Sequence, residues 1–220
     1  MNITRIKGVI FDVDGVLLDS MTIWTDLGAR YLRSIGSTPE EGLAEILFSM
    51  SMEQGAAYLN ERYELGREQS EIMSSLEDML RDFYFYEVEA KPGAEELLGR
   101  LSDAGVKMVA ATSSPREHIE RALSRNGLLS YIDRLFTVSE VGFSKHTPEI
   151  YHIASEYMGT VPCETYVFED SLYALETAAA AGYHTVGVFD AAGEADQEGL
   201  RVKAEIYIKS LGEFVDRANF

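Results

Sequence analysis

The chain has 220 residues, of which 46% are apolar and 25% charged, enough for one substantial core or for a core domain with a smaller companion. Its formal net charge of −18 argues against nucleic acid and anionic membranes as partners, because both are bound through clusters of Lys and Arg. No segment reaches the ~20 apolar residues that span a bilayer, and the single cysteine, Cys163, cannot form an internal disulfide. We therefore expect a cytoplasmic protein, with a monomer as the starting assumption.

The first predicted element is an apolar strand at residues 7–11. From Leu18 to about Glu89 the apolar residues recur with helical spacing and form no buried-strand run. Within this stretch, a capping box from Thr38 to Glu41 predicts the start of one helix. The helical stretch is therefore expected to be an insertion, a cap domain over residues 17–89.

After the helical stretch, short apolar runs alternate with amphipathic segments, as in βα units around a parallel sheet. The predicted strands lie at 106–111, 135–138, 165–168, 185–189 and 205–208, and the predicted helices at about 93–104, 115–127, 148–158 and 171–181. The expected fold is α/β, a Rossmann-like parallel sheet core over residues 1–16 and 90–220 with an inserted helical cap.

Two acidic residues, Asp12 and Asp14, follow the first predicted strand and precede Gly15. Residues two apart in an extended chain face the same way at roughly 6–7 Å, so the pair could serve as nucleophile and proton donor. A simple Asp-Gly turn explains the same pattern. A calcium loop of the EF-hand type does not, because Ile23 stands where its twelfth residue must be glutamate.

A second acidic pair, Glu169-Asp170, follows another predicted strand. Asp170 could simply cap the next helix. Together with the first pair, however, it would bring four carboxylates to neighbouring strand ends, which is unfavourable without a cation. Mg²⁺, a hard ion with oxygen ligands, is the predicted cofactor, held by Asp12, Asp14, Glu169 and Asp170.

Two further strand ends could bind a phosphate group. Thr112 closes the strand at 106–111, and its hydroxyl with the backbone N–H of Ser113 would make an anion site. Ser114 is explained as the start of a capping box with Glu117. Lys145 is either an ordinary solvated lysine or, following a strand of the same sheet, a cation for Asp12 and a phosphate.

These four clusters, in this order, resemble the motifs of the haloacid dehalogenase superfamily, and the resemblance covers nearly the whole chain. Residues Phe11–Ser20 match the first motif and Phe168–Ser171 the fourth, while Thr112 and Lys145 are weaker matches in the correct places. The subgroup with a helical cap after the first strand, similar to β-phosphoglucomutase and phosphoglycolate phosphatase, fits best.

The resemblance implies a phosphatase acting on a small phosphorylated metabolite. Asp12 would attack phosphorus to give an aspartyl-phosphate, and Asp14 would protonate the leaving oxygen and then activate water. Mg²⁺ would be held by Asp12, the backbone carbonyl of Asp14 and Asp170, with Glu169 reaching it directly or through water. The residues implied in phosphate binding are Thr112, Ser113 and Lys145.

Two alternatives stay open. A phosphomutase of the β-phosphoglucomutase type would hold a second phosphate with a basic cap residue, and the cap segment Phe48–Gln54 has no Lys or Arg. A non-catalytic protein that binds metal or phosphate is the other alternative. The third and fourth motifs also depart from the family pattern after their key residues, at His146-Thr147 and at Leu172–Leu175, which affects the substrates that fit.

Overall fold

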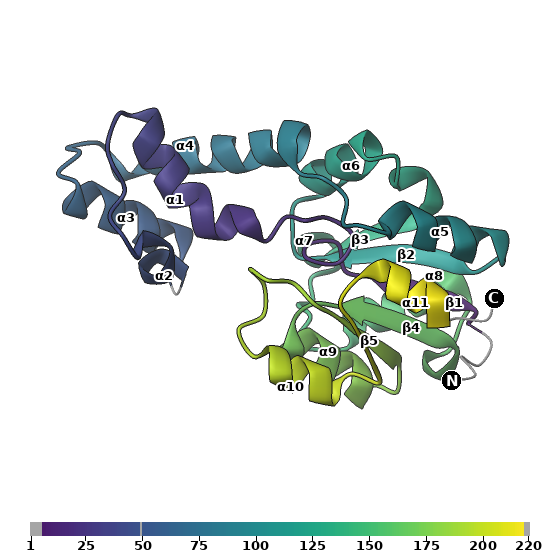
Figure 1. Cartoon of the computed structure of the whole chain (residues 1–220). Helices are drawn as coiled ribbons and strands as arrows, with labels where there is room; N and C mark the ends of the chain where they lie inside the picture. The colour runs from purple at the N-terminus through teal and green to yellow at the C-terminus, as the bar shows by residue number, and fades with distance from the viewer. Residues whose placement is uncertain (1–5, 49, 218–220) are drawn as a thin grey trace. The chain divides into compact units, whose positions relative to one another are not determined.

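The computed structural model describes residues 6–48 and 50–217 of the chain, which form two compact units (Figure 1). The helical unit is Ser20–Glu87, and the core unit comprises the described residues up to Asp19 and from Val88 onward. Residues 17–19 and 88–89, which the sequence assigns to the cap, thus belong to the core unit. Ser49, in the cap segment without Lys or Arg, lies outside the described residues.

The core unit is built on a six-stranded parallel sheet with strand order β3-β2-β1-β4-β5-β6. The strands are β1 (Gly8–Phe11), β2 (Lys107–Thr112), β3 (Arg134–Thr137), β4 (Thr165–Glu169), β5 (His184–Val188) and β6 (Ile206–Ile208). The central strands are buried along their whole length, as expected of a parallel sheet covered on both faces. The predicted Rossmann-like α/β core is confirmed.

Strand β1 lies between β2 and β4, with Phe11 level with both Ala110 and Phe168. The chain progresses in opposite directions on the two sides of β1, so the switch point of the sheet falls beside this strand. Ligands of open α/β sheets bind in the crevice that such a reversal leaves at the carboxyl ends of the strands. The ends of β1, β2 and β4 are therefore where the fold favours a site.

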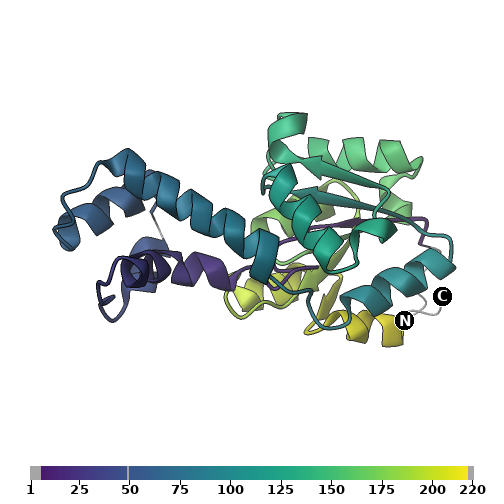
Figure 2. The same ribbon diagram turned by 90° about the horizontal axis from the view of Figure 1, so that it is seen from above.

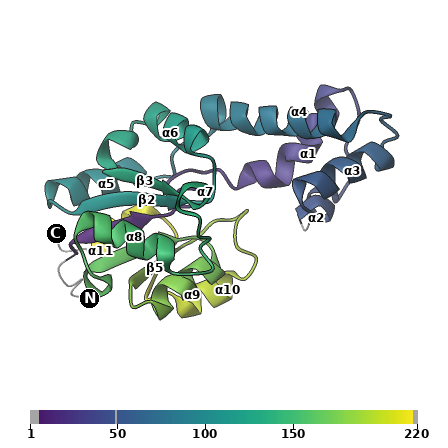
Figure 3. The same ribbon diagram turned by 180° about the vertical axis from the view of Figure 1, so that it is seen from behind.

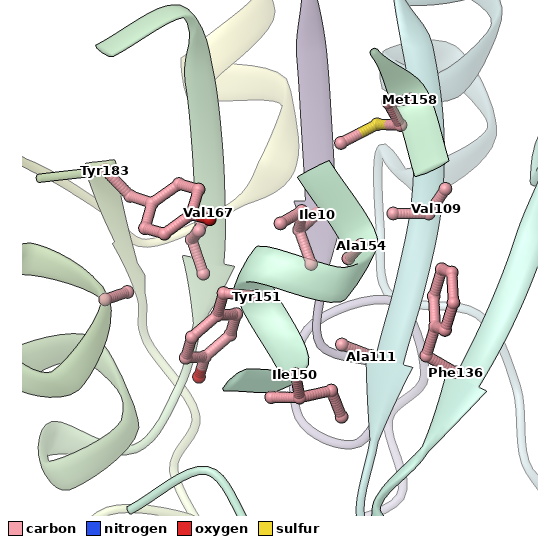
Figure 4. Close-up of a cluster of buried hydrophobic side chains, with 11 residues drawn as sticks. Ile10, Val109, Ala111, Phe136, Ile150, Tyr151, Ala154, Met158, Val167 and Tyr183 are labelled. Atoms are coloured by element: carbon pink, nitrogen blue, oxygen red, sulfur yellow. The ribbon is translucent and has the colours of Figure 1, made fainter. Parts of the chain in front are cut away.

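Helices cover both faces of the sheet (Figure 2). On one face α8 and α9 contribute Tyr151, Ala154 and Ala178 to a buried cluster with Ile10 and Val167 of the sheet (Figures 3 and 4). On the other face α11 contacts both α5 and β6. The core helices are α5 (Ala94–Asp103), α6 (Arg116–Arg125), α7 (Val138–Val141), α8 (Glu149–Met158), α9 (Leu172–Ala180), α10 (Gln197–Lys203) and α11 (Leu211–Arg217).

The helical unit consists of α1 (Thr22–Ser34), α2 (Leu43–Phe48), α3 (Met52–Arg62), α4 (Gln69–Asp82) and a π-helical turn at Phe83–Glu87. Its helices are amphipathic and bury one face each, for example Ile72, Leu76 and Leu80 of α4. Within residues 6–48 and 50–217, no helix combines the length and apolar character that a membrane span requires.

The capping box predicted at Thr38–Glu41 is wrong, because the nearest helix, α2, begins only at Leu43. Gly42 adopts a φ of 80°, which no helix interior allows, so a helix cannot run from Thr38 through this position. Glu40 accepts hydrogen bonds from Tyr58 and Arg62 instead. The capping box of this unit is at the start of α3, where Ser51 and Gln54 bond each other's backbone N–H groups.

Candidate active site

The first acidic pair lies in a tight turn after β1. The backbone N–H of Asp12 donates to the carbonyl of Phe168 on β4, which fixes the position of Asp12 between the two strands. Gly15 has a φ of 76°, and the chain turns back so that the N–H of Leu18 reaches the carbonyl of Val13. Asp12 is nearly buried, with 7% of its surface exposed.

The second acidic pair lies at the end of β4, which neighbours β1. Carboxylate oxygens of Asp12, Glu169 and Asp170 lie within 4.8 Å of one another, and all three residues are buried. Within the described part of the chain, Glu169 Oε2 is buried without a hydrogen-bond partner. Three buried carboxylates with an unused oxygen are a donor set that suits a hard divalent cation, so these residues fit Mg²⁺.

Lys145 points into this cluster and is 3% exposed. Its Nζ lies 2.5 Å from Asp12 Oδ1 and 2.8 Å from Glu169 Oε1. Lys145 is therefore not the solvated surface lysine of the simpler interpretation. Tyr151 of α8 also donates to Glu169 Oε1, at 2.8 Å. Tyr151 could not be selected from the sequence, since it is one of several residues on the apolar face of its helix.

Burial and the repulsion between neighbouring carboxylates raise the pKa values of Asp12 and Asp170. Burial, and then the charges of Glu169, Asp170 and Asp14, raise the pKa of Asp12 well above its usual value, against the opposing effect of Lys145. Burial and the charge of Glu169 raise the pKa of Asp170 to about 7. A single lysine thus does not neutralise the site, and a bound cation would relieve the remaining repulsion.

Asp14 is held by two hydroxyls at the end of β2. Ser114 Oγ donates to Asp14 Oδ2 at 2.7 Å, and Thr112 Oγ1 lies 3.4 Å from the same oxygen. Thr112 Oγ1 also accepts from the backbone N–H of Ser114, at 3.1 Å. These bonds place Thr112 beside Asp14, while Ser113 is exposed at the strand end.

The predicted capping box from Ser114 to Glu117 is wrong. Helix α6 begins at Arg116, after Pro115, and has no side-chain cap, because the Ser114 hydroxyl is bonded to Asp14. The sequence did contain a sign that Ser114 could contact Asp14 beside Thr112. Ser114 is two residues after Thr112, a spacing that places both side chains on the same side of an extended chain.

His146 and Tyr173 are the two departures from the family pattern that the structure brings together. Their rings stack with centroids 4.2 Å apart and an interplanar angle of 26°. Tyr173 is 41% exposed, and burial raises the pKa of its hydroxyl, while the charge of Lys145 opposes the shift. An aromatic surface therefore borders the buried lysine.

Comparison with known proteins identifies the family to which the chain belongs. The family model of haloacid dehalogenase-like hydrolases matches residues 6–182. The chain is 30% identical over 181 residues to a phosphorylated carbohydrates phosphatase of Thermotoga maritima, covering 82% of this chain and 83% of that protein. It is 28% identical over 187 residues to hexitol phosphatase A of Escherichia coli, covering 84% and 83%.

Solved structures show the same fold. A Thermotoga maritima protein provisionally called a β-phosphoglucomutase superposes with a TM-score of 0.86 at 26% identity, over 96% of this chain and 98% of that one. A hydrolase of the haloacid dehalogenase family from Deinococcus radiodurans, solved with bound phosphate and sodium, gives a TM-score of 0.77 at 26% identity, over 96% and 93%. The family resemblance read from the sequence is confirmed: this chain belongs to the haloacid dehalogenase-like hydrolases.

Proposed function

We propose that this enzyme is a Mg²⁺-dependent phosphatase that hydrolyses a small phosphomonoester through an aspartyl-phosphate on Asp12. One observation carries the proposal: the Asp12 carboxylate is buried beside Lys145, within 4.8 Å of two further carboxylates. The proposed nucleophile is therefore paired with a positively charged lysine and lies next to carboxylates that can bind a metal ion.

Asp12, Asp170 and the backbone carbonyl of Asp14 are the proposed ligands of Mg²⁺, with Glu169 reaching it directly or through water. Bound there, the ion would supply positive charge against the phosphoryl oxygens and the attacking carboxylate. Lys145 already bonds Asp12 and Glu169 and would add a second cation for the phosphate. The Thr112 hydroxyl and the Ser113 N–H would accommodate the remaining phosphate oxygens.

In the first half of the reaction, a carboxylate oxygen of Asp12 forms a bond to phosphorus as the bond to the leaving alcohol oxygen breaks. Asp14, entering this step protonated, gives its proton to that leaving oxygen. In the second half, Asp14 takes a proton from water, the water oxygen bonds to phosphorus, and the bond to Asp12 breaks. The Ser114 hydroxyl keeps Asp14 oriented in both halves.

The proposed substrates are phosphorylated sugars and polyols. Two relatives that align over most of their length are named a phosphorylated carbohydrates phosphatase and a hexitol phosphatase. The helical unit would serve as the cap that excludes water and selects the substrate. Within the helical unit, one cavity of about 100 Å³ is lined by Trp24, Leu47, Met50 and Met52 among others.

A phosphomutase is disfavoured because four arginines of the helical unit, Arg30, Arg33, Arg62 and Arg81, are paired with carboxylates of the same unit. Arg30 is paired with Asp26 and Glu87, and Arg62 with Glu40. A mutase needs a basic residue of the cap to hold a second phosphate, and paired arginines are poorly suited to that task.

The test is phosphate release from a panel of sugar and polyol phosphates, with and without Mg²⁺. We expect turnover that requires both Mg²⁺ and Asp12, with Asp12→Asn inactive and Asp103→Asn, at an exposed carboxylate of α5, fully active. Isomerised sugar phosphate without phosphate release would establish the mutase instead. Mg²⁺ binding without any turnover would overturn the enzyme proposal in favour of a binding protein.

A further inference from the structure

A third strand of the core unit, β5, is also followed by a buried carboxylate. Asp190 is 4% exposed and forms an ion pair with Lys91, whose Nζ lies 2.6 Å from Asp190 Oδ2. Lys91 is itself largely buried, and its Nζ also donates to the carbonyl of Phe189, at 3.0 Å. Neither residue belongs to the four motifs of the proposed active site.

The loop after β5, residues 189–196, passes directly over a proposed metal ligand. Asp190 Oδ1 accepts the backbone N–H of Ala192 at 2.8 Å, which closes a tight turn. This turn brings Gly193 so close to the active site that an added Cβ would lie 2.9 Å from Asp170 Oδ2. The Gly193 backbone therefore packs against the carboxylate of Asp170.

The same loop is tied to the segment that carries Asp170 by a second contact. Glu194 Oε2 accepts the backbone N–H of Leu172, the first residue of α9, at 2.8 Å. Asp170 lies two residues before the start of this helix, and Glu194 satisfies one of the N–H groups that a helix start leaves unbonded. The loop thus contacts Asp170 at the carboxylate and at the chain that follows it.

A buried ion pair is a costly way to hold a loop, since desolvation offsets most of its attraction and a well-packed apolar pair is often as stable. An apolar pair, however, has no oxygen atom to accept the backbone N–H of Ala192. It could not form the turn that leads to Gly193. The ion pair therefore has a use that its contribution to stability does not explain.

We propose that Lys91 and Asp190 are positioning residues that hold the loop 189–196 against Asp170 and thereby fix this carboxylate for a divalent cation. The inference rests on the proposed function, in which Asp170 binds Mg²⁺. Lys91 neutralises and orients Asp190, Asp190 shapes the turn, and Gly193 limits the movement of the Asp170 side chain. In many proteins, residues that contact a metal ligand without touching the metal orient that ligand.

The test compares two double variants of the full chain, Lys91→Met/Asp190→Asn and Lys91→Met/Asp190→Leu. Both remove the two charges, but only asparagine keeps an Oδ1 that accepts the Ala192 N–H. We expect the Asn variant to bind Mg²⁺ with nearly wild-type affinity and the Leu variant to bind it about 10- to 100-fold more weakly, measured by calorimetric titration.

Two glycine variants keep the test decisive if the Leu variant does not fold. Gly193→Ala adds a Cβ against Asp170 and should weaken Mg²⁺ binding by about tenfold. Gly212→Ala, where a Cβ meets no atom within 4 Å, should leave the affinity unchanged. Breaking the exposed pair between Lys203 and Glu176 with Lys203→Met is the control for charge loss at the surface.

Equal Mg²⁺ affinity in both double variants, whether weakened or not, would overturn the positioning role, because charge or simple stability would then account for the pair. A wild-type protein that binds Mg²⁺ but releases no phosphate refutes the proposed phosphatase alone and leaves the positioning role intact. A wild-type protein that binds no Mg²⁺ refutes both.

Discussion

The hydroxyl of Ser114 donates a hydrogen bond to the carboxylate of Asp14, the proposed proton donor. We expect Ser114→Ala to lower kcat by about tenfold, because a misdirected proton donor loses part of the 10²- to 10⁴-fold that positioned acid–base groups contribute. The rate of phosphate release at saturating substrate measures this. Ser124→Ala, at an exposed serine of α6, is the matched control, and an unchanged kcat in Ser114→Ala would refute the orienting role.

Tyr151 keeps the buried Glu169 carboxylate supplied with a hydrogen-bond donor. Burial raises the pKa of the Tyr151 hydroxyl, so it remains protonated at all ordinary pH values. We expect Tyr151→Phe to lower the free energy of unfolding by about 1.5–3 kcal/mol, the range for a lost bond to a charged group, measured by urea denaturation.

The control for Tyr151 lies on the same helix. Tyr157 is 49% exposed, and its hydroxyl makes only a long contact, 3.4 Å, to the carbonyl of Asp133. Tyr157→Phe should change the free energy of unfolding by less than about 0.5 kcal/mol. An equal loss of unfolding free energy in Tyr151→Phe and Tyr157→Phe would show that the hydrogen bond to Glu169 adds no particular stability.

The acidic residues of the site could be predicted from the sequence, whereas the residues that form hydrogen bonds with them could not. Asp12 directly follows β1 and Glu169 is the last residue of β4, so local sequence places both at strand ends. The bond from Tyr151 to Glu169 joins residues 18 positions apart through the packing of α8 on the sheet. The lining of the substrate site by the helical unit stays a prediction.

At the scale of elements, the start of α5 depends on one glycine. Gly93 has a φ of 85°, and a Cβ there would lie 2.8 Å from the backbone nitrogen of Gly212 in α11. We expect Gly93→Ala to lose about 1–2 kcal/mol from the left-handed conformation, and about 1–3 kcal/mol more because the two helices are forced apart. Urea denaturation measures both losses together.

The Gly105→Ala variant separates the cost of the left-handed backbone conformation from the cost of forcing α5 and α11 apart. Gly105 also has a positive φ, 71°, but a Cβ there meets no atom within 4 Å, so only the conformational cost of about 1–2 kcal/mol applies. If Gly93→Ala were no more destabilising than Gly105→Ala, the close approach of α5 and α11 would not matter for stability.

The strands and long helices of the core unit were predictable because apolar periodicity and glycine or proline boundaries agree there. The short helices were not. Val138, predicted as the end of a strand, begins α7, because the Thr137 hydroxyl accepts the N–H of Glu140 and caps a helix of one turn. The two wrong capping boxes have a common cause, since a capping pattern is local and a tertiary hydrogen bond can replace it.

At the scale of the whole molecule, proton and Mg²⁺ binding should be coupled. The pKa of Asp170, about 7 in the folded metal-free protein, lies above its usual 3.8. Between these values the folded chain holds a proton that the unfolded chain lacks, so this group's contribution to the free energy of unfolding falls as the pH rises. Mg²⁺ at the proposed site would require the charged carboxylate of Asp170 and would release that proton.

The stabilisation that a fixed concentration of Mg²⁺ confers should therefore grow as the pH rises from about 5.5 to about 7, by up to about 1.4 kcal/mol per pH unit for each proton released, and then level off. The Mg²⁺-induced change in Tm across this range measures it. Asp170→Asn should lose the effect, and a change in Tm that is independent of pH would contradict the coupling.

The net charge of −18 shows what composition can and cannot predict. It argues against polyanionic surfaces as partners, yet the site proposed here binds an anion. Local charge resolves the conflict, because Lys145 is buried among the carboxylates and a divalent cation fits beside it. The order of the βα units was enough to predict the parallel sheet, whereas the buried pair of Lys91 and Asp190 depends on contacts 99 residues apart and was not foreseen.

Asp12 is proposed to carry the phosphoryl group between the two halves of the reaction. The most direct test is mass spectrometry of the Asp14→Asn variant, mixed with Mg²⁺ and p-nitrophenyl phosphate, whose leaving group needs no proton from Asp14, and quenched in acid. With no group to activate water, this variant should accumulate a phosphoryl group on the peptide that contains Asp12, and the Asp12→Asn variant should show none. Free phosphate released by Asp12→Asn at the wild-type rate, or a phosphoryl group on another residue, would contradict the account.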